Sequence, residues 1–428
     1  MINIEEYKDP QHHIETSKFL NPKKLYLPLS QHTGKPSIAC VKRGDMVEEA
    51  AQIAESSAFI STNLHAPKKG KILNIDTWFH PNLKKSEAIF MDCLDQESNY
   101  QTRGNIESLK KEELIDIIKN NGIVGLGGAA FPTYVKLSPP KEIDTFIING
   151  CECEPYLACD YRLMKENLNE IFIGIEIINK IIQPKKIIFA IEENKRDILE
   201  KIKSLMVNKK YNLPSIEIAV LKTAYPQGGE KQLIYATTKR KVAGGKLPFD
   251  TGCLVHNVAT LFAIYEAIYL NKPLIERLVS FAGDSLVSPK NVWVKIGTTL
   301  KEIFDQKILK FKDSPKKIIC GGPMMGVSLN KLDYPILKGT GGFLFLNKEI
   351  SEVEESPCIR CGRCLDSCPM NLMPLEYAKR IKVEEYDRLE EYNINDCMEC
   401  GCCTYTCPSK IPIVQYIKVG KKYLPTSS

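Results

Sequence analysis

The sequence predicts a multidomain α/β protein that ends in a cysteine-rich module. The chain has 428 residues, which corresponds to about three domains of ordinary size. Within 105–265, runs typical of buried strands, at 145–148 and 187–191, alternate with helical periods at 164–180 and 198–206. This alternation is the pattern of an α/β layer. More than half of the 16 cysteines fall in two tight clusters near the C-terminus, so a separate cysteine module follows the α/β body.

Composition and charge place the chain among globular proteins, with 43% hydrophobic and 26% charged residues. Its 58 basic and 52 acidic residues leave a net charge of +6 spread along the sequence, which does not predict nucleic-acid binding. No stretch approaches the roughly 18 consecutive apolar residues of a membrane span, and residues 1–23 are polar, so we expect no transmembrane segment and no secretory signal. In such a chain, clustered cysteines favour metal ligation over disulfides.

Both cysteine clusters have the spacing C-x2-C-x2-C-x3-C-P, one from Cys358 to Pro369 and the other from Cys397 to Pro408. Thiolates suit iron and sulfide, and in this spacing three cysteines hold one [4Fe-4S] cluster while the fourth ligates the other. The segment between the motifs is free of glycine and mixes apolar with charged residues, which predicts a helix. The expected ligands are Cys358, Cys361, Cys364 and Cys407 for cluster 1, and Cys368, Cys397, Cys400 and Cys403 for cluster 2.

A zinc ribbon is the competing interpretation of paired C-x2-C motifs, but four cysteines per motif, the x3 gap and the trailing proline are not zinc spacing. Cys402 breaks the two-residue gap if it replaces Cys403, so we treat Cys402 as a spare thiol. Upstream, Cys151, Cys153 and Cys159 lack a fourth partner nearby, which favours isolated core thiols over a third metal site.

A glycine-rich segment, residues 122–136, is the second candidate site. Gly125, Gly127 and Gly128 allow the backbone to approach a phosphate or a flat ring, and Lys136 can neutralise an anion. The spacing is not the dinucleotide-binding G-x-G-x-x-G, and a glycine-rich turn between helices is an equally good interpretation of this segment alone.

The glycine-rich segment resembles the flavin loop of the NADH-oxidising subunit of respiratory complex I. Three further stretches match that subunit in the same order: 148–155 resembles its acidic loop under the flavin and nicotinamide, 225–230 its second acidic loop, and 256–260 its ring-contacting Asn-Val-x-Thr. The order of parts is closer still to the RnfC family of the Rnf complex, and this resemblance covers nearly the whole chain. It is carried by Gly-Ile-Val-Gly-Leu-Gly-Gly-Ala-Ala-Phe-Pro-Thr, Cys-Glu-Pro-Tyr-Leu, Gly-Gly-Pro-Met-Met-Gly and Cys-Ile-Arg-Cys-Gly-Arg-Cys.

The resemblance implies four domains. Residues 1–100 would form an N-terminal extension and a lipoyl-like barrel-sandwich domain, 105–265 a Rossmann-like α/β domain for FMN and NADH, 270–335 a β-grasp domain of the SLBB type, and 350–428 a helical two-cluster ferredoxin domain. A swinging-arm carrier needs a lysine at its hairpin tip, yet residues 57–64 contain none. We therefore expect a structural or docking role for the barrel.

The resemblance also implies site residues. Gly125, Gly127, Gly128 and Lys136 would seat the FMN phosphate and ribityl chain. Asn149, Asn257 and Thr260 would hold the ring and the ribityl hydroxyls, while Glu152, Glu154 and Glu230 would line the nucleotide face. The cofactors would carry the chemistry, so no catalytic side chain is expected.

As a member of that family, the chain would be a peripheral subunit on the cytoplasmic side of the cell (inner) membrane. It would pass electrons between NADH, FMN and two [4Fe-4S] clusters, within a translocase that couples NAD(H) and ferredoxin chemistry to Na+ or H+ transport. Its partners would be the other subunits of an Rnf-type complex and, indirectly, ferredoxin. Two alternatives stay open: a soluble NADH-dependent flavin and iron-sulfur reductase serving a cobalamin or amino-acid reductase, and an electron wire without flavin.

Overall fold

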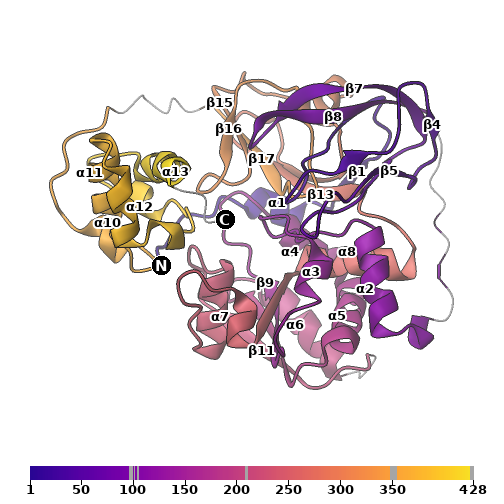
Figure 1. Cartoon of the computed structure of the whole chain (residues 1–428), viewed down its shortest axis with the longest axis horizontal. Helices are drawn as coiled ribbons and strands as arrows, with labels where there is room; N and C mark the ends of the chain where they lie inside the picture. The colour runs from indigo at the N-terminus through magenta and orange to yellow at the C-terminus, as the bar shows by residue number, and fades with distance from the viewer. Residues whose placement is uncertain (96–99, 101, 104–105, 208–210, 348–353, 425–428) are drawn as a thin grey trace.

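The computed structural model of the chain describes residues 1–95, 100, 102–103, 106–207, 211–347 and 354–424. These residues form four sheets and a helical C-terminal lobe (Figure 1). The multidomain α/β class is confirmed. Two of the predicted domain starts, residues 105 and 350, and the predicted last residue, 428, lie outside the described residues.

The N-terminal region folds into two small sheets that share one core. Leu25, Ile53, Ile72 and Ile89 are fully buried in this core. In β7, Ile72 is buried while its neighbours on both sides are exposed, the period of two that a half-buried strand requires. One sheet has the order β2 (Lys24–Pro28), β8 (Lys84–Cys93), β7 (Gly70–His80) and β4 (Met46–Val47), and the other β3 (Ile38–Ala39), β5 (Gln52–Glu55) and β6 (Leu64–His65).

The lysine-free tip of this region, residues 57–64, connects β5 to β6 and contacts the next domain. The Tyr134 hydroxyl donates a hydrogen bond to the Phe59 carbonyl oxygen. Nearby, the Thr33 hydroxyl donates to the Ala129 carbonyl oxygen at 2.6 Å and the Thr33 main-chain N–H donates to Ala130 at 3.2 Å. Two loops of the N-terminal region therefore contact the glycine-rich segment.

The central layer is a parallel four-stranded sheet in the order β11 (Ile216–Leu221), β10 (Lys186–Glu192), β9 (Thr145–Gly150), β12 (Cys253–Asn257). All residues of β9 are buried, as expected for a strand covered on both faces. The predicted strands are confirmed. The predicted helical stretch 164–180 is interrupted at Asn167, between α4 (Cys159–Glu166) and α5 (Leu168–Ile182), and α6 (Arg196–Val207) matches the second predicted helix.

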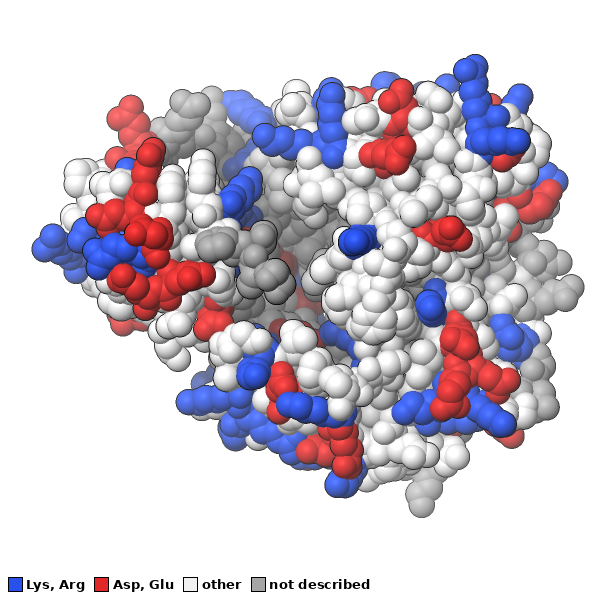
Figure 2. Space-filling view, viewed as in Figure 1, with Lys and Arg blue, Asp and Glu red and all other residues white. Residues whose placement is uncertain are grey.

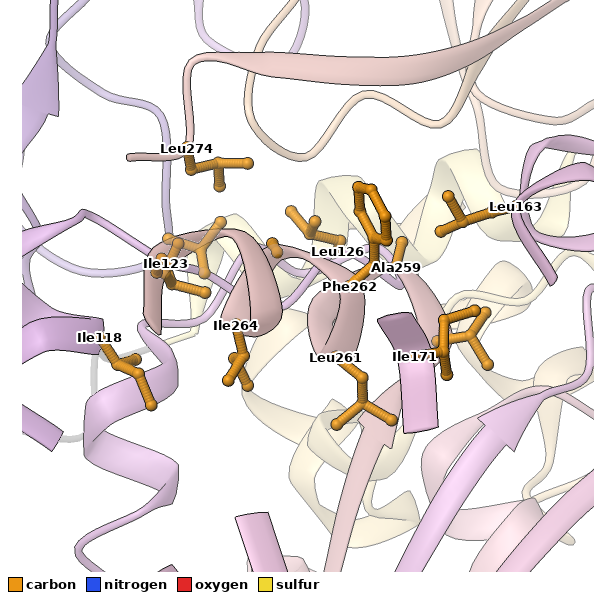
Figure 3. Packing of buried hydrophobic residues seen from close by; sticks show 14 of the residues in the cluster. Ile118, Ile123, Leu126, Leu163, Ile171, Ala259, Leu261, Phe262, Ile264 and Leu274 are labelled. Carbon is orange, nitrogen blue, oxygen red and sulfur yellow. The ribbon is translucent and has the colours of Figure 1, made fainter. Parts of the chain in front are cut away.

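The core beside this sheet is built where α5 packs against α8 (Val258–Tyr269). Figure 3 shows Leu261 and Phe262 of α8 among Leu163, Ile171 and other buried side chains. A Cβ atom on Gly174 of α5 would lie 2.2 Å from the Leu261 carbonyl oxygen. This close approach of the two helices therefore requires glycine, and it fixes the position of the α8 N-terminus.

The fourth sheet has six strands, with Val279, Phe281, Phe343 and Phe345 in its core. Four of its strands and the short helix α9 (Leu300–Asp305) come from residues 270–335. The sheet also takes strands from outside 270–335, namely β1 near the N-terminus and β17. Its order is β1 (Ser17–Phe19), β14 (Lys290–Lys295), β13 (Glu276–Ala282), β17 (Gly342–Leu346), β15 (Lys317–Cys320), β16 (Val327–Leu329).

The C-terminal lobe is helical, and α11 (Pro374–Lys382) confirms the helix predicted between the cysteine motifs. It packs on α13 (Ile413–Tyr423), where a Cβ on Gly420 would lie 2.7 Å from the Ile381 side chain. Two short helices, α10 (Arg363–Asp366) and α12 (Cys402–Tyr405), each begin inside a cysteine motif. No helix among the described residues is long and apolar enough to span a membrane.

Lys338, in the segment between β16 and β17 of the six-stranded sheet, contacts both the N-terminal region and the glycine-rich segment. Its side chain is 1% exposed. The ammonium donates to the carbonyl oxygens of Asn63 at 2.7 Å and Gly122 at 2.8 Å, and the Lys338 main-chain N–H donates to the Gln31 side chain at 3.0 Å. Burial lowers the pKa of Lys338 to about 7.

Replacing Lys338 by methionine should reduce the pH dependence of stability. The pKa of this lysine is about 7 when folded, below its ordinary value of 10.5. Between these values the unfolded chain binds more protons, so the stability of the unsubstituted protein rises with pH in this window. Lys338→Met should lose about 2 kcal/mol of that rise between roughly pH 7 and pH 9. Urea midpoints at both pH values measure it, with the exposed lysine variant Lys203→Met as control. Equal slopes in all three proteins would contradict the assignment.

Candidate flavin site and iron-sulfur cavities

The glycine-rich segment lies on the N-terminus of α8. The Gly125 N–H donates to the Phe131 carbonyl oxygen at 2.8 Å, and the Leu126 N–H donates to the Thr260 hydroxyl oxygen at 2.9 Å. A Cβ on Gly127 would lie 3.1 Å from the Asn257 side chain. Gly128 has a φ of +140° and open space, with nothing within 4 Å of a Cβ built on it. The segment thus presents an open backbone face that fits the close approach of a flat or phosphorylated ligand.

Asn257 and Thr260 connect that segment to the sheet. Asn257 ends β12, and its side-chain oxygen caps α8 by accepting from the Ala259 N–H at 2.8 Å. Its amide donates to the Asp160 carboxylate at 2.6 Å. Burial, with the nearby Glu152 carboxylate, raises the pKa of Asp160, which this amide opposes. Asp160 is a half-buried acid of this site, and it follows the acidic loop 148–155 in the sequence.

Asn149 pairs with Asn257 across the β9–β12 ladder, so both lie at the carboxyl end of the parallel sheet, where open α/β sheets bind their ligands. The Asn149 amide donates to the Gly228 carbonyl oxygen at 2.9 Å, and its oxygen accepts from the Cys151 N–H at 3.0 Å. Asn149 therefore links β9 to the second acidic loop.

Glu152 is buried, and its carboxylate accepts from the Asp160 N–H at 3.0 Å and the Tyr161 N–H at 3.3 Å, at the start of α4. The Cys159 thiol donates to the same carboxylate at 3.3 Å. These bonds fix the acidic loop to the α4 N-terminus, where a negative charge is favoured.

Glu154 binds the Gly-Gly-Pro-Met-Met-Gly loop at 321–326. Its carboxylate accepts from the Met324 N–H at 3.1 Å and the Met325 N–H at 2.9 Å. Burial raises the pKa of Glu154 to about 7, although these two bonds oppose the shift. A Cβ on Gly322 would lie 2.1 Å from the carboxylate. A side chain at position 322 would clash with this carboxylate, so the second glycine of the loop motif is required by the contact with Glu154.

Lys136 and Glu230, expected on the phosphate and the nucleotide, form one ion pair at 2.6 Å. The Lys136 ammonium also lies 3.4 Å from the Val255 carbonyl oxygen of β12. Glu230 begins α7 (Glu230–Thr238), and its side chain is 38% exposed. The two side chains lie at the same end of the sheet as Asn149 and Asn257, and both are partly exposed to solvent.

The C-terminal cysteines gather around two cavities. Each cavity takes its fourth cysteine from the other motif, as the crossed spacing predicts. Four soft sulfur donors around one cavity fit a [4Fe-4S] cluster. One cavity is lined by Cys358, Cys361, Cys364 and Cys407, and the other by Cys368, Cys397, Cys400 and Cys403, with Cys402 at its wall.

The second cavity borders the acidic loops, and Tyr225 connects them. Tyr225 is buried; its hydroxyl donates to the Cys400 carbonyl oxygen at 2.7 Å and lies 3.5 Å from the Glu154 carboxylate. Its backbone pairs with Ile2 of the N-terminal segment. Tyr225 is the first residue of the motif at 225–230, but only the packing of the folded chain shows that Tyr225 contacts the cysteine module.

Three family descriptions match the chain. The RnfC barrel sandwich hybrid domain matches residues 2–96, the Nuo51 FMN-binding domain residues 118–266, and the 4Fe-4S dicluster domain residues 357–411. The fold is also similar to a crystal structure of NAD+-reducing [NiFe]-hydrogenase in the H2-reduced state. That similarity has a TM-score of 0.53 at 17% identity, covering 74% of this chain and 63% of that one.

Two relatives, both RnfC-type subunits, are similar over most of their length. The one from the proton-translocating ferredoxin:NAD(+) oxidoreductase complex of Clostridium ljungdahlii is 44% identical, over 88% of this chain and 82% of its own. The one from the Na(+)-translocating ferredoxin:NAD(+) oxidoreductase complex of Acetobacterium woodii is 37% identical, over 88% of this chain and 85% of its own. With these identities and with matches to the RnfC barrel, FMN-binding and dicluster descriptions, the chain belongs to the RnfC family of ion-translocating ferredoxin:NAD(+) oxidoreductase complexes.

Proposed function

We propose that this subunit passes electrons between NAD(H) and the other redox centres of its complex, through FMN on the glycine-rich segment and two [4Fe-4S] clusters. The adjacency of the two sites is the main support. Tyr225 contacts both the Cys400 backbone of the second cavity and the Glu154 loop. When bound, a flavin would accept one hydride, which carries two electrons, and release them one at a time, which is the conversion that an iron-sulfur cluster needs.

In this proposal the residues of the chain bind and orient the FMN. Gly125, Gly127 and Gly128 leave the backbone face open, and Lys136 supplies the positive charge for a phosphate. Asn149 and Asn257 present their amides at the carboxyl ends of neighbouring strands. The Thr260 hydroxyl accepts from Leu126, so Thr260 acts by fixing the segment.

The three acids have different roles in this proposal. The Glu152 and Glu154 carboxylates accept hydrogen bonds from backbone N–H groups, so they shape the nucleotide face by positioning loops. The Glu230 side chain is 38% exposed, and among the described residues its only partner of opposite charge is Lys136. Glu230 is therefore the acid best placed to meet the nucleotide.

Within its complex the subunit would be peripheral, on the cytoplasmic side of the membrane. It would exchange electrons indirectly with ferredoxin, and its domains would follow the order of barrel, FMN domain, β-grasp domain of the SLBB type and two-cluster module. Membrane fractionation tests the location: the subunit should sediment with membranes and be released by a chaotrope wash. A subunit that stays in the supernatant at low salt would favour a soluble reductase.

Stopped-flow mixing of the purified holoprotein with NADH tests the electron path. NADH should bleach the flavin absorbance first and the iron-sulfur absorbance afterwards. In Glu230→Gln the FMN should be retained, and the NADH concentration for half-maximal bleaching should rise a few-fold, the scale of a partly exposed carboxylate.

Glu217→Gln is the matched control, because Glu217 also forms an ion pair with a lysine, Lys186, at 2.6 Å on another part of the domain. It should behave as the unsubstituted protein. The proposed path would be overturned if NADH bleached the iron-sulfur absorbance without bleaching the flavin absorbance, or if NADH bleached neither.

A further inference from the structure

The two cysteine loops have the same conformation. Gly362 and Gly401 have φ values of +78° and +83°. The N–H groups of Arg360 and Glu399 donate to the first cysteine sulfur of each motif, both at 3.4 Å. A short helix follows each glycine. Equivalent positions can therefore be compared directly: Ile359 with Met398, Arg360 with Glu399, Gly362 with Gly401, and Arg363 with Cys402.

In the second loop these positions pack against Tyr225 of the flavin domain and against the 321–326 loop between β15 and β16. Cys402 is fully buried and packs in one cluster with Tyr225, Met324 and Met398. A Cβ on Gly401 would lie 2.7 Å from the Met324 carbonyl oxygen. The loop around this cysteine cavity thus meets two neighbouring domains, the flavin domain among them, through an apolar side chain, a glycine and the residue after that glycine.

In the first loop the side chains at the same positions are exposed. Ile359 is 67% exposed, and a Cβ on Gly362 would have nothing within 4 Å. The side chains of Arg360 and Arg363 are exposed, and within the described ranges neither takes part in an ion pair. Cys358 and Cys361 of this loop are exposed as well. An apolar residue beside exposed cysteines and two unpaired cations is the composition of an interface before its partner binds.

We propose that this first loop, Ile359 with Arg360, Gly362 and Arg363, is the surface on which a second one-electron redox protein of the complex docks. The docking face of that partner protein has an apolar hollow for Ile359 and carboxylates opposite Arg360 and Arg363. The positive charge of Arg360 and Arg363 is a local feature of this loop, because basic and acidic side chains are interspersed over the face shown in Figure 2. The proposal rests on the proposed function. NADH supplies the electrons, each transfer moves one electron to the oxidised partner, and no covalent bond changes.

Photo-crosslinking in the assembled complex tests the docking independently of electron flow. With p-benzoylphenylalanine in place of Ile359, light should join the subunit to another redox subunit. The same probe at Val207, which is 79% exposed on α6, should not give that product. Iron content and the EPR signals of reduced clusters show that the first cluster is intact. An intact Ile359 variant that gives no cross-link, or the same product from both positions, would overturn the proposal.

A charge reversal provides the second arm. Arg360→Glu with Arg363→Glu should slow NADH-driven reduction of the other subunits at least about tenfold and flatten its dependence on ionic strength. Lys203→Glu, a reversal at an exposed lysine of α6, should change neither. Unchanged transfer and salt dependence in the double variant would refute the surface. If NADH does not reduce the clusters of the unsubstituted subunit, the proposed function fails, while the cross-link still decides the docking.

Discussion

Gly128→Val is expected to abolish FMN binding and NADH oxidation while leaving both iron-sulfur clusters in place. Gly128 has a φ of +140°, which a β-branched residue rarely adopts, and its missing side chain faces open space. A valine would both strain the segment and fill the backbone face assigned to the flavin. The FMN content should fall at least about tenfold, a loss of roughly 1.4 kcal/mol or more in binding. Flavin absorbance measures the loss of FMN, and iron content with EPR after dithionite reduction shows whether both clusters are retained.

Gly44→Val separates backbone strain from the blocked site. Gly44 also has a positive φ, +97°, and open space around its Cβ position, but it lies in the turn before β4. This variant should keep FMN and NADH oxidation. If Gly128→Val retains full NADH oxidation, the flavin site lies elsewhere in the chain.

Loss of one cysteine should remove the cluster of the other motif. Cys407 lines the cavity of Cys358, Cys361 and Cys364, and Cys368 lines the cavity of the second motif. Cys407→Ser should therefore damage cluster 1 and Cys368→Ser cluster 2, each with loss of up to half of the bound iron. EPR of the reduced variants identifies the remaining cluster.

Cys402→Ser is the matched control, because Cys402 lies in the same motif as Cys400 and Cys403 and is expected to ligate nothing. Its iron content should equal that of the unsubstituted protein. If Cys368→Ser removes the same EPR signal as Cys358→Ser, the ligands are not crossed.

Features that depend on local spacing could be predicted from the residues alone. The cysteine motifs predicted which thiols share a cavity, because the fixed gaps make three cysteines of one loop converge and direct the fourth to the other loop. The glycines at 125, 127 and 128 predicted an open backbone face for the same reason, since a missing Cβ acts within its own loop. Strand and helix periodicity predicted the central layer.

Contacts between distant segments emerge only from the packing of the folded chain. The Gly322 position is explained by the Glu154 carboxylate, which comes from another loop. Lys136 and Glu230 received separate roles from their motifs, yet they form one ion pair. The repeated cysteine loops share one spacing, but Met398 of the second loop packs with Tyr225 and Met324, while Ile359 at the same position of the first loop is 67% exposed. The physical reason is that spacing along the chain constrains neighbours within a loop, whereas the meeting of two loops depends on how whole domains pack.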